Sequence, residues 1–365
     1  MSGPSPTRTP PTAARPGATP GRSTRARTLG LLAVVVGLHV VAFGLLLAFV
    51  VPAQLHVGAQ VFGLGLGVTA YVYGLRHAFD PDHIAAIDNV TRKLVADGQR
   101  PVSVGFWFAM GHSTLVAILA VLVAVGARAA TTLLDGGSST RETLGLVGTF
   151  TSGAFLYLIG ILNLVALVGI ARVFLGARTG GLDEARLEQL LANRGLLARI
   201  LQPLTRAISR PWQMYLVGAL FGLGFDTATE ISLLVLAGAG AASGLPWYAV
   251  VVLPLLFASG MSLLDFLDGV FMNTAYSWAF TNPIRKVYYN LAITGLSVAV
   301  ALFVGTIELV GILHEKAGWT DPVSTAIASV SLDDVGFVVV GLFVVFWAAA
   351  VGYWKVGRVE QRWSH

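Results

Sequence analysis

The stretch 76-RHAFDPDH-83 decides how this chain folds, because it places two histidines, two aspartates and a proline inside a hydrophobic segment. Ionisable side chains at membrane depth are costly, and they usually mark an ion or substrate pathway. On an unbroken helix, His77 and His83 would lie about 120° apart around the axis and would not converge. Pro81 has no amide hydrogen and clashes with the carbonyl four residues earlier, so it predicts a kink or a break in this helix.

Composition identifies the class of protein. The chain is 55% hydrophobic and only 12% charged, whereas soluble domains have about 25% charged residues. It therefore belongs to the integral membrane proteins. The absence of cysteine excludes disulfides, thiolate metal sites and iron–sulfur clusters. No P-loop pattern is present, so no nucleotide is expected, and the net charge of +5 is assigned to cytoplasmic loops and not to a nucleic-acid partner.

We predict an all-α polytopic membrane protein with eight spans, since about 20 mostly apolar residues cross a bilayer. Of the 24 lysines and arginines, 20 lie in the tails and loops on one side of these spans and three lie in the opposite loops. Because cytoplasmic loops are enriched in basic residues, both termini are predicted to be cytoplasmic, with the protein in the cytoplasmic membrane. The predicted spans are 29–52, 58–79, 102–127, 146–175, 213–239, 247–270, 288–312 and 335–354.

The segments outside the spans differ in composition. Residues 1–28 are rich in Pro, Thr, Gly and Arg and predict a disordered cytoplasmic tail, and residues 355–365 form a second tail. In the loop 176–212, leucines alternate with arginines, which predicts an amphipathic helix on the inner leaflet. A solvated linker helix explains that loop equally well. Residues 29–354 are predicted to form one transmembrane domain in contact with membrane lipid.

An internal repeat is visible in the sequence. The stretch 108-FAMGHSTL-115 resembles 257-FASGMSLL-264, and the pairs 74-GL-75 and 79-FD-80 resemble 222-GL-223 and 225-FD-226. Under the predicted topology the second span runs inward and the fifth outward, so the two copies would be inverted. Inverted repeats with broken, polar helices at their interface are a recurring design of secondary transporters. Chance similarity between short glycine-rich stretches is the alternative.

Imidazole and carboxylate together suit borderline divalent metals such as nickel, cobalt and zinc. His77, Asp82 and His83 are therefore predicted metal ligands, because the break can turn the Asp82–His83 pair towards the side that His77 faces. His112 follows in the next span and is a fourth predicted ligand. Asp80 before a proline is also good helix-start chemistry, and a broken helix requires a cap as well as supplying a site.

Further carboxylates are predicted along the pathway. Asp226 and Glu230 are four residues apart and would share a helical face. Their repulsion requires a proton or cation between them, unless they pair with Arg76. Asp265 and Asp268 also share a face, and they would either attract cations at the inner mouth or lie at the interface. The other pathway and helix-shaping residues are Asp80, Asn163, Pro81, Gly111, Ser113 and Thr114.

These motifs resemble those of the nickel/cobalt transporter family (NiCoT) over residues 29–354. That family is marked by His-x4-Asp-His in its second helix, matched here by His77, Asp82 and His83. The stretches 111-GHST-114 and 223-LGFDTATE-230 resemble two further family motifs, and 260-GM-261 followed by Asp265 and Asp268 resembles a fourth. Two residues depart from the pattern: Pro81 stands where a small residue is usual, and Phe266 where a threonine is expected.

The resemblance implies high-affinity uptake of Ni²⁺ or Co²⁺ across the cytoplasmic membrane, with the metal as substrate and with no cofactor or catalysis. Metal exporters of the same superfamily are an alternative, but they tend to have a histidine-rich loop, which this chain lacks. A membrane metalloenzyme is a more distant alternative. Seven histidines, with three clustered, are too few for the histidine boxes of membrane di-iron oxygenases, and no His-Glu-x-x-His run occurs.

Overall fold

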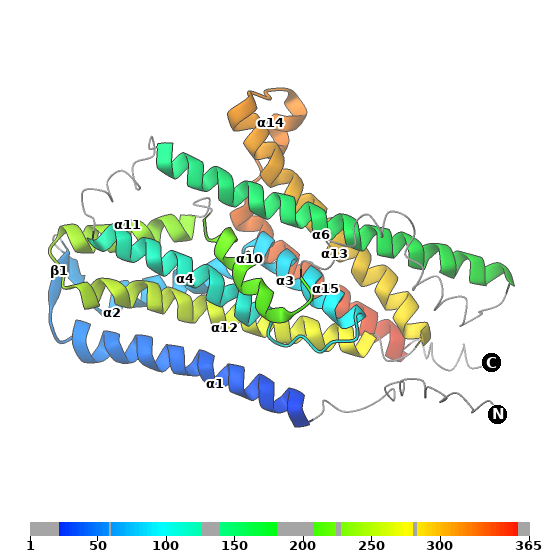
Figure 1. Ribbon diagram of the computed structural model, residues 1–365, viewed down its shortest axis with the longest axis horizontal. Helices are drawn as coiled ribbons and strands as arrows, with labels where there is room; N and C mark the ends of the chain where they lie inside the picture. The colour runs from blue at the N-terminus through cyan, green and yellow to red at the C-terminus, as the bar shows by residue number, and fades with distance from the viewer. Residues whose placement is uncertain are drawn as a thin grey trace, which may run out of the picture.

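The computed structural model describes residues 22–57, 60–125, 139–180, 208–223, 228–279 and 283–356. Within these ranges the protein is an all-α bundle with one small antiparallel hairpin, β1 (Leu55–Val57) and β2 (Gln60–Phe62) (Figure 1). This confirms the predicted fold class. The α-helices are α1 (Arg22–Leu45), α2 (Leu64–His77), α3 (Pro81–Ala96), α4 (Val104–Val125), α6 (Ser139–Gly180), α10 (Met214–Phe221), α11 (Ala228–Ala242), α12 (Trp247–Ala279), α13 (Pro283–Ala317), α14 (Pro322–Ala328) and α15 (Leu332–Val356).

Five of the described helical segments are long and apolar enough to cross a membrane. They lie in α1, α4, α6, α12 and α13, and two shorter apolar segments lie in α11 and α15. Large apolar side chains on α1, among them Val34, Val36 and Val40, are exposed. A contiguous apolar surface of this kind is expected to face lipid. The chain is therefore a multi-pass membrane protein.

Several predicted boundaries differ from the structure. Helix α1 begins at Arg22, inside the predicted tail, and continues into a short π-helix, Leu46–Val50. The hairpin occupies the first residues of the predicted span 58–79, so α2 begins only at Leu64. The remaining parts of both tails and most of the predicted amphipathic loop helix, residues 181–207, lie outside the described residues.

The predicted break at Pro81 is present. Helix α2 ends at His77, Asp80 has extended backbone angles (φ −61°, ψ 132°), and Pro81 is the first residue of α3. The Asp80 side chain makes no capping hydrogen bond, but its backbone N–H donates to the His77 carbonyl at 2.9 Å. The two helices therefore form one broken element, with Asp80 at the turn between them.

The predicted spans leave residues 80–101 as a loop between 58–79 and 102–127, but most of this segment forms helix α3. Helix α3 is buried in the bundle and packs against α12, α13, α6 and α15. Its polar residues lower the mean hydropathy, which made the segment resemble a loop. Those residues bond inside the protein: Asn89 accepts a hydrogen bond from Asn163 at 2.6 Å, and Arg92 donates to Thr294 at 3.3 Å.

A second break separates α10, which ends at Phe221, from α11, which begins at Ala228, and residues 224–227 between them lie outside the described residues. Helix α2 packs closely on α12, because a Cβ added at Gly74 would lie 2.0 Å from the Phe257 carbonyl oxygen. Helix α10 packs in the same way on α4, because a Cβ at Gly218 would lie 2.1 Å from the Phe108 carbonyl oxygen. Phe108 and Phe257 occupy the same position in the two copies of the predicted repeat.

The contacts are also reciprocal. A Cβ added at Gly111 would lie 1.8 Å from the Tyr215 carbonyl oxygen, and one added at Gly260 would lie 2.5 Å from that of Tyr71. Figure 1 shows α4 and α12 side by side and running in opposite directions. Matching contacts between helices of opposite direction support the interpretation of an inverted repeat.

The close α2–α12 contact yields a stability prediction. Replacing Gly74 by alanine should destabilise the protein by about 1–3 kcal/mol, because the new Cβ must separate two backbones. Gly65 on the same helix has no heavy atom within 4 Å of its added Cβ, so Gly65→Ala is a matched control that should not destabilise. Thermal unfolding of both variants in detergent measures the difference. Equal midpoints would show that α2 and α12 do not pack as closely as described.

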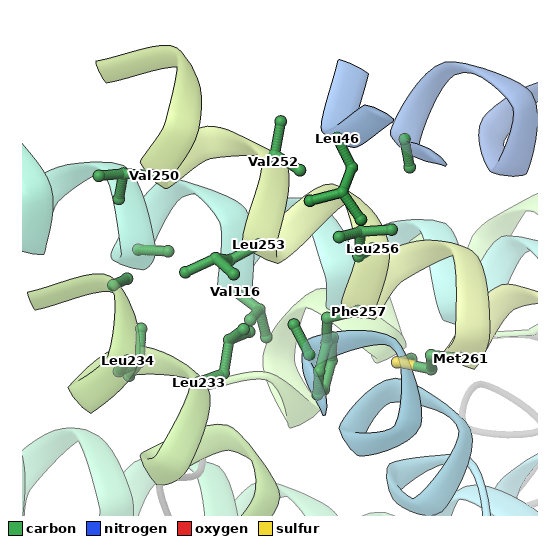
Figure 2. Close-up of a cluster of buried hydrophobic side chains, with 14 of the residues drawn as sticks. Leu46, Val116, Leu233, Leu234, Val250, Val252, Leu253, Leu256, Phe257 and Met261 are labelled. Carbon is green, nitrogen blue, oxygen red and sulfur yellow. The ribbon is translucent and has the colours of Figure 1, made fainter. Parts of the chain in front are cut away.

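Two apolar cores enclose the middle of the bundle. The first, shown in Figure 2, joins α1, α2, α4, α11 and α12 and includes Leu46, Val116, Leu253 and Phe257. The second surrounds α3 and includes Phe108. The Phe257 ring lies 5.4 Å from that of His77, and the Phe108 ring lies 4.7 Å from that of His83. The histidines of the broken helix therefore lie between the two cores, shielded from water.

Candidate metal centre

Three histidines from three helices converge at the break. His77 ends α2, His83 lies in the first turn of α3, and His112 lies in α4. Their ligand atoms all lie within 4.8 Å of one another, and all three side chains are buried. Nε2 of His77 and Nε2 of His112 are 2.9 Å apart, and the ring centroids of His77 and His83 are 4.6 Å apart. The break thus brings together two rings that a continuous helix would separate.

Groups around the histidines orient their rings. Nδ1 of His77 lies 3.2 Å from Oδ2 of Asp80 and 3.2 Å from Oγ1 of Thr229. Nδ1 of His83 lies 3.5 Å from Oδ2 of Asp265. A carboxylate on the far ring nitrogen is the usual support of a metal-binding histidine, because it fixes the tautomer and raises the basicity of the other nitrogen. The arrangement leaves Nε2 of both rings for the centre.

Glu230 supplies a carboxylate to the centre itself. It lies in the first turn of α11, and its Oε1 is 2.7 Å from Nε2 of His112 and 3.9 Å from Nε2 of His77. The side chain is almost fully buried. The sequence predicts Glu230 as a charge-balancing residue, and the structure places it within reach of an ion held by the histidines.

Asp82, a predicted ligand, is placed elsewhere. Its Oδ1 accepts a hydrogen bond from the His83 backbone N–H at 2.8 Å, and its Oδ2 lies 3.3 Å from Oγ of Ser152 on α6. The same Ser152 hydroxyl lies 2.9 Å from Oε1 of Glu308 on α13. Adjacent residues on a helix point about 100° apart, so Asp82 and His83 do not face the same point. Asp82 therefore lies beside the histidine centre, towards α6 and α13.

The remaining predicted pathway residues fall into three groups. Asp226 lies outside the described residues. Asp265 is 1% exposed and lies against His83, and Asp268 follows one turn later on α12. Asn163 donates to Asn89 across the α6–α3 contact and so forms a hydrogen bond between two helices.

Of the three predicted shaping residues on α4, two contact neighbouring helices and one does not. Gly111 lies against the backbone of α10 at Tyr215. Oγ of Ser113 lies 3.8 Å from Sδ of Met261 on α12. Thr114, by contrast, donates to the Met110 carbonyl of its own helix at 2.6 Å and is exposed, so it does not bond across helices.

Two polar contacts at the site were not predicted. Thr229 lies within the stretch 223–230 that carries the family resemblance, so a signal was present, although only the carboxylates were chosen from it. Ser152 stands in an apolar segment with no distinctive pattern, and nothing in the sequence singled it out.

The charge around the centre suits a divalent cation. Asp80, Glu230 and Asp265 are 8%, 2% and 1% exposed, and each lies against one of the three imidazoles. Buried carboxylates are costly unless a proton or a cation balances them. Among the described residues, the three histidines are the one group of three or more ligand side chains close enough to share a metal ion. Imidazole nitrogens with added carboxylate oxygen suit borderline divalent metals.

The fold and this centre define a polytopic membrane protein with a buried site for a divalent metal. The family described as high-affinity nickel-transport protein matches residues 63–352, and the chain belongs to that family. It is 57% identical over 338 residues to the nickel transporter NicT of Mycobacterium tuberculosis, covering 92% of this chain and 91% of the relative.

Two other relatives also align with this chain over most of the length of both sequences. The nickel transporter NixA of Staphylococcus aureus is 43% identical over 94% of this chain and 98% of its own. The cobalt transport protein NhlF of Rhodococcus rhodochrous is 40% identical over 90% of this chain and 93% of its own. No solved structure matches the chain.

Proposed function

We propose that this protein moves Ni²⁺ or Co²⁺ across the cytoplasmic membrane into the cell as a secondary permease. The observation that supports this most strongly is the convergence of His77, His83 and His112 in a buried position at a helix break, with Glu230 beside them. Nitrogen-rich sites of this kind bind nickel and cobalt well and do not separate one from the other. Relatives named for nickel and for cobalt agree with that ligand set.

Two broken elements meeting at one site support transport over storage or sensing. The α2–α3 break provides His77 and His83, and α11, which follows the second break, provides Thr229 and Glu230. Broken helices of inverted repeats are a common site of substrate binding in secondary transporters, because relative movement of the repeats opens the site to each side in turn. We infer that the two breaks form the substrate-binding site that opens to each side of the membrane in turn.

The membrane potential is a sufficient driving force. Two positive charges moving inward gain about 4.6 kcal/mol per 100 mV. In the topology with both termini cytoplasmic, α3 and α12 run from the histidine centre towards the cytoplasm. The metal is then the substrate and not a cofactor, and the protein is not an enzyme.

The experiment is accumulation of radioactive nickel in cells that express the chain, compared with cells that carry an empty vector. We expect accumulation that depends on expression and that excess cobalt suppresses, while manganese, which prefers oxygen ligands, suppresses it much less. Lower nickel content in expressing cells would instead assign export. Equal content in both cell lines would contradict transport in either direction.

A further inference from the structure

Buried carboxylates continue beyond the histidine centre, along the contact between α3 and α12. Asp265 lies against His83, Asp268 follows one turn later on α12, and Asp88 lies on α3. We call these three residues the carboxylate column. Asp265 and Asp88 are buried, whereas Asp268 is partly exposed with its Oδ2 buried. The column therefore begins at the metal centre and includes one partly exposed residue.

The packing of the two helices determines the order of the column. His83 lies beside Asp265, a Cβ added at Gly269 would lie 3.8 Å from Cγ2 of Ile87, and the Tyr276 hydroxyl donates to Oδ1 of Asp88. Helices α3 and α12 thus run in the same direction away from the centre. Asp268 directly precedes Gly269, and Ile87, on which Gly269 packs, directly precedes Asp88. A cation leaving His83 would meet Asp265 first, and then Asp268 and Asp88.

Four of the six carboxylate oxygens in the column have no hydrogen-bond partner among the described residues. They are both oxygens of Asp265, of which Oδ2 lies 3.5 Å from Nδ1 of His83, Oδ2 of Asp268 and Oδ2 of Asp88. The other oxygen of Asp88 is held by Tyr276, whose hydroxyl also lies 3.1 Å from Oγ of Ser297. Neighbouring buried carboxylates repel one another unless a proton or a cation lies between them. A proton or a cation is therefore needed to balance the charge of the column that its hydrogen bonds and Arg92 leave unbalanced.

Arg92 bounds the column at its far end. It lies one helical turn beyond Asp88, is 4% exposed, and donates from Nη1 to Thr294 at 3.3 Å. Its Nε and Nη2 have no hydrogen-bond partner among the described residues. A fixed guanidinium here offsets part of the negative charge of Asp88 and repels an approaching dication. It therefore keeps binding at this end of the column weak.

We propose that Asp268 and Asp88 form a second binding site for the transported divalent cation. It lies on the cytoplasmic side of the histidine centre, with Asp265 between the two sites. This inference rests on the proposed transport function. The ligands change along the path from imidazole nitrogen to carboxylate oxygen alone. Nickel and cobalt bind nitrogen ligands more tightly than oxygen ligands, so the second binding site has a lower affinity than the histidine centre and favours release of the ion into the cytoplasm.

The test is a titration of the purified full chain in detergent with Co²⁺, whose visible absorption reports its ligands. We expect two bound equivalents with different visible spectra, the first with bands at shorter wavelength, because imidazole nitrogen gives a stronger ligand field than carboxylate oxygen. Asp88→Asn and Asp268→Asn should each lose the second equivalent, keep the first spectrum, and reduce cellular uptake about tenfold or more. Asp97→Asn is the matched control, because Asp97 lies just after α3 beside Lys93 and outside the column.

The possible failures are distinguishable. If the wild-type protein binds only one equivalent of Co²⁺, the second binding site is ruled out but the transport proposal is not affected. Wild-type protein that binds no Co²⁺, in cells that accumulate no metal, overturns the transport proposal itself. If the asparagine variants also lose the first spectrum, Asp88→Glu and Asp268→Glu, which keep the charge, must restore both equivalents. If the glutamate variants bound only one equivalent of Co²⁺, the proposal of a second binding site would be wrong.

Discussion

Nickel accumulation by cells that express His77→Ala should fall to the level of cells with an empty vector. His77 is the middle of the centre: its Nε2 lies 2.9 Å from that of His112, and its ring centroid lies 4.6 Å from that of His83. Removing it leaves two imidazoles that come from different helices. Loss of a supporting residue alone weakens metal sites by about 10–100-fold, so loss of a ligand should weaken binding by at least about 100-fold.

A matched control separates this effect from a general sensitivity to histidine loss. His39 on α1 lies outside the centre, where its Nδ1 donates to the Val35 carbonyl of its own helix at 2.8 Å. His39→Ala should therefore transport at the normal rate. Both variants are quantified in membranes by immunoblotting, and initial rates of nickel uptake are divided by the amount of protein. A His77→Ala rate close to that of the unaltered chain would remove the histidine centre from the transport path.

The break and its histidines were predictable because proline acts locally. The missing amide hydrogen and the steric clash of Pro81 are properties of the residue alone, so the break followed from sequence, although the helix after it was not among the predicted spans. The stretch around His112 was recognisable as one copy of a repeat, and the reciprocal glycine contacts of α2 with α12 and of α10 with α4 support that repeat.

The burial of α3 was not predictable from mean hydropathy. That quantity averages over all faces of a helix, and Asp88, Asn89 and Arg92 lower the average although they are inside the protein. Their burial depends on partners far along the chain: Tyr276 for Asp88, Asn163 for Asn89 and Thr294 for Arg92. Sequence spacing alone does not reveal which distant side chains meet.

The same limit applies to the prediction of which carboxylates lie against the imidazoles. Asp82 and His83 are neighbours in sequence, which made them resemble a ligand pair, but the 100° step between them directs Asp82 towards Ser152. Glu230 is more than a hundred residues away and reaches His112 only because α11 packs on α4. The family motif located both carboxylates in the sequence, and the fold decided which of them lies against the imidazoles.

Glu230→Gln should weaken Co²⁺ binding at the histidine centre by about 10–100-fold and shift the visible spectrum of the bound ion. The substitution keeps the shape of the side chain but removes a buried negative charge 2.7 Å from Nε2 of His112, so the charge of a bound dication is less well balanced. Asp82→Asn, one residue before a ligand, should change the affinity and spectrum less, because its carboxylate faces Ser152.

Glu315→Gln, on the exposed end of α13 beside Lys316, serves as the control for loss of one acidic group and should bind like the unaltered chain. Titration of all three variants in detergent gives the comparison. If Asp82→Asn weakened Co²⁺ binding more than Glu230→Gln, the fourth ligand would be Asp82, as the sequence motif suggests. The break between α2 and α3 would then have to turn far enough on metal binding to bring Asp82 to the ion, which makes the pair of variants a test of whether the centre is preformed.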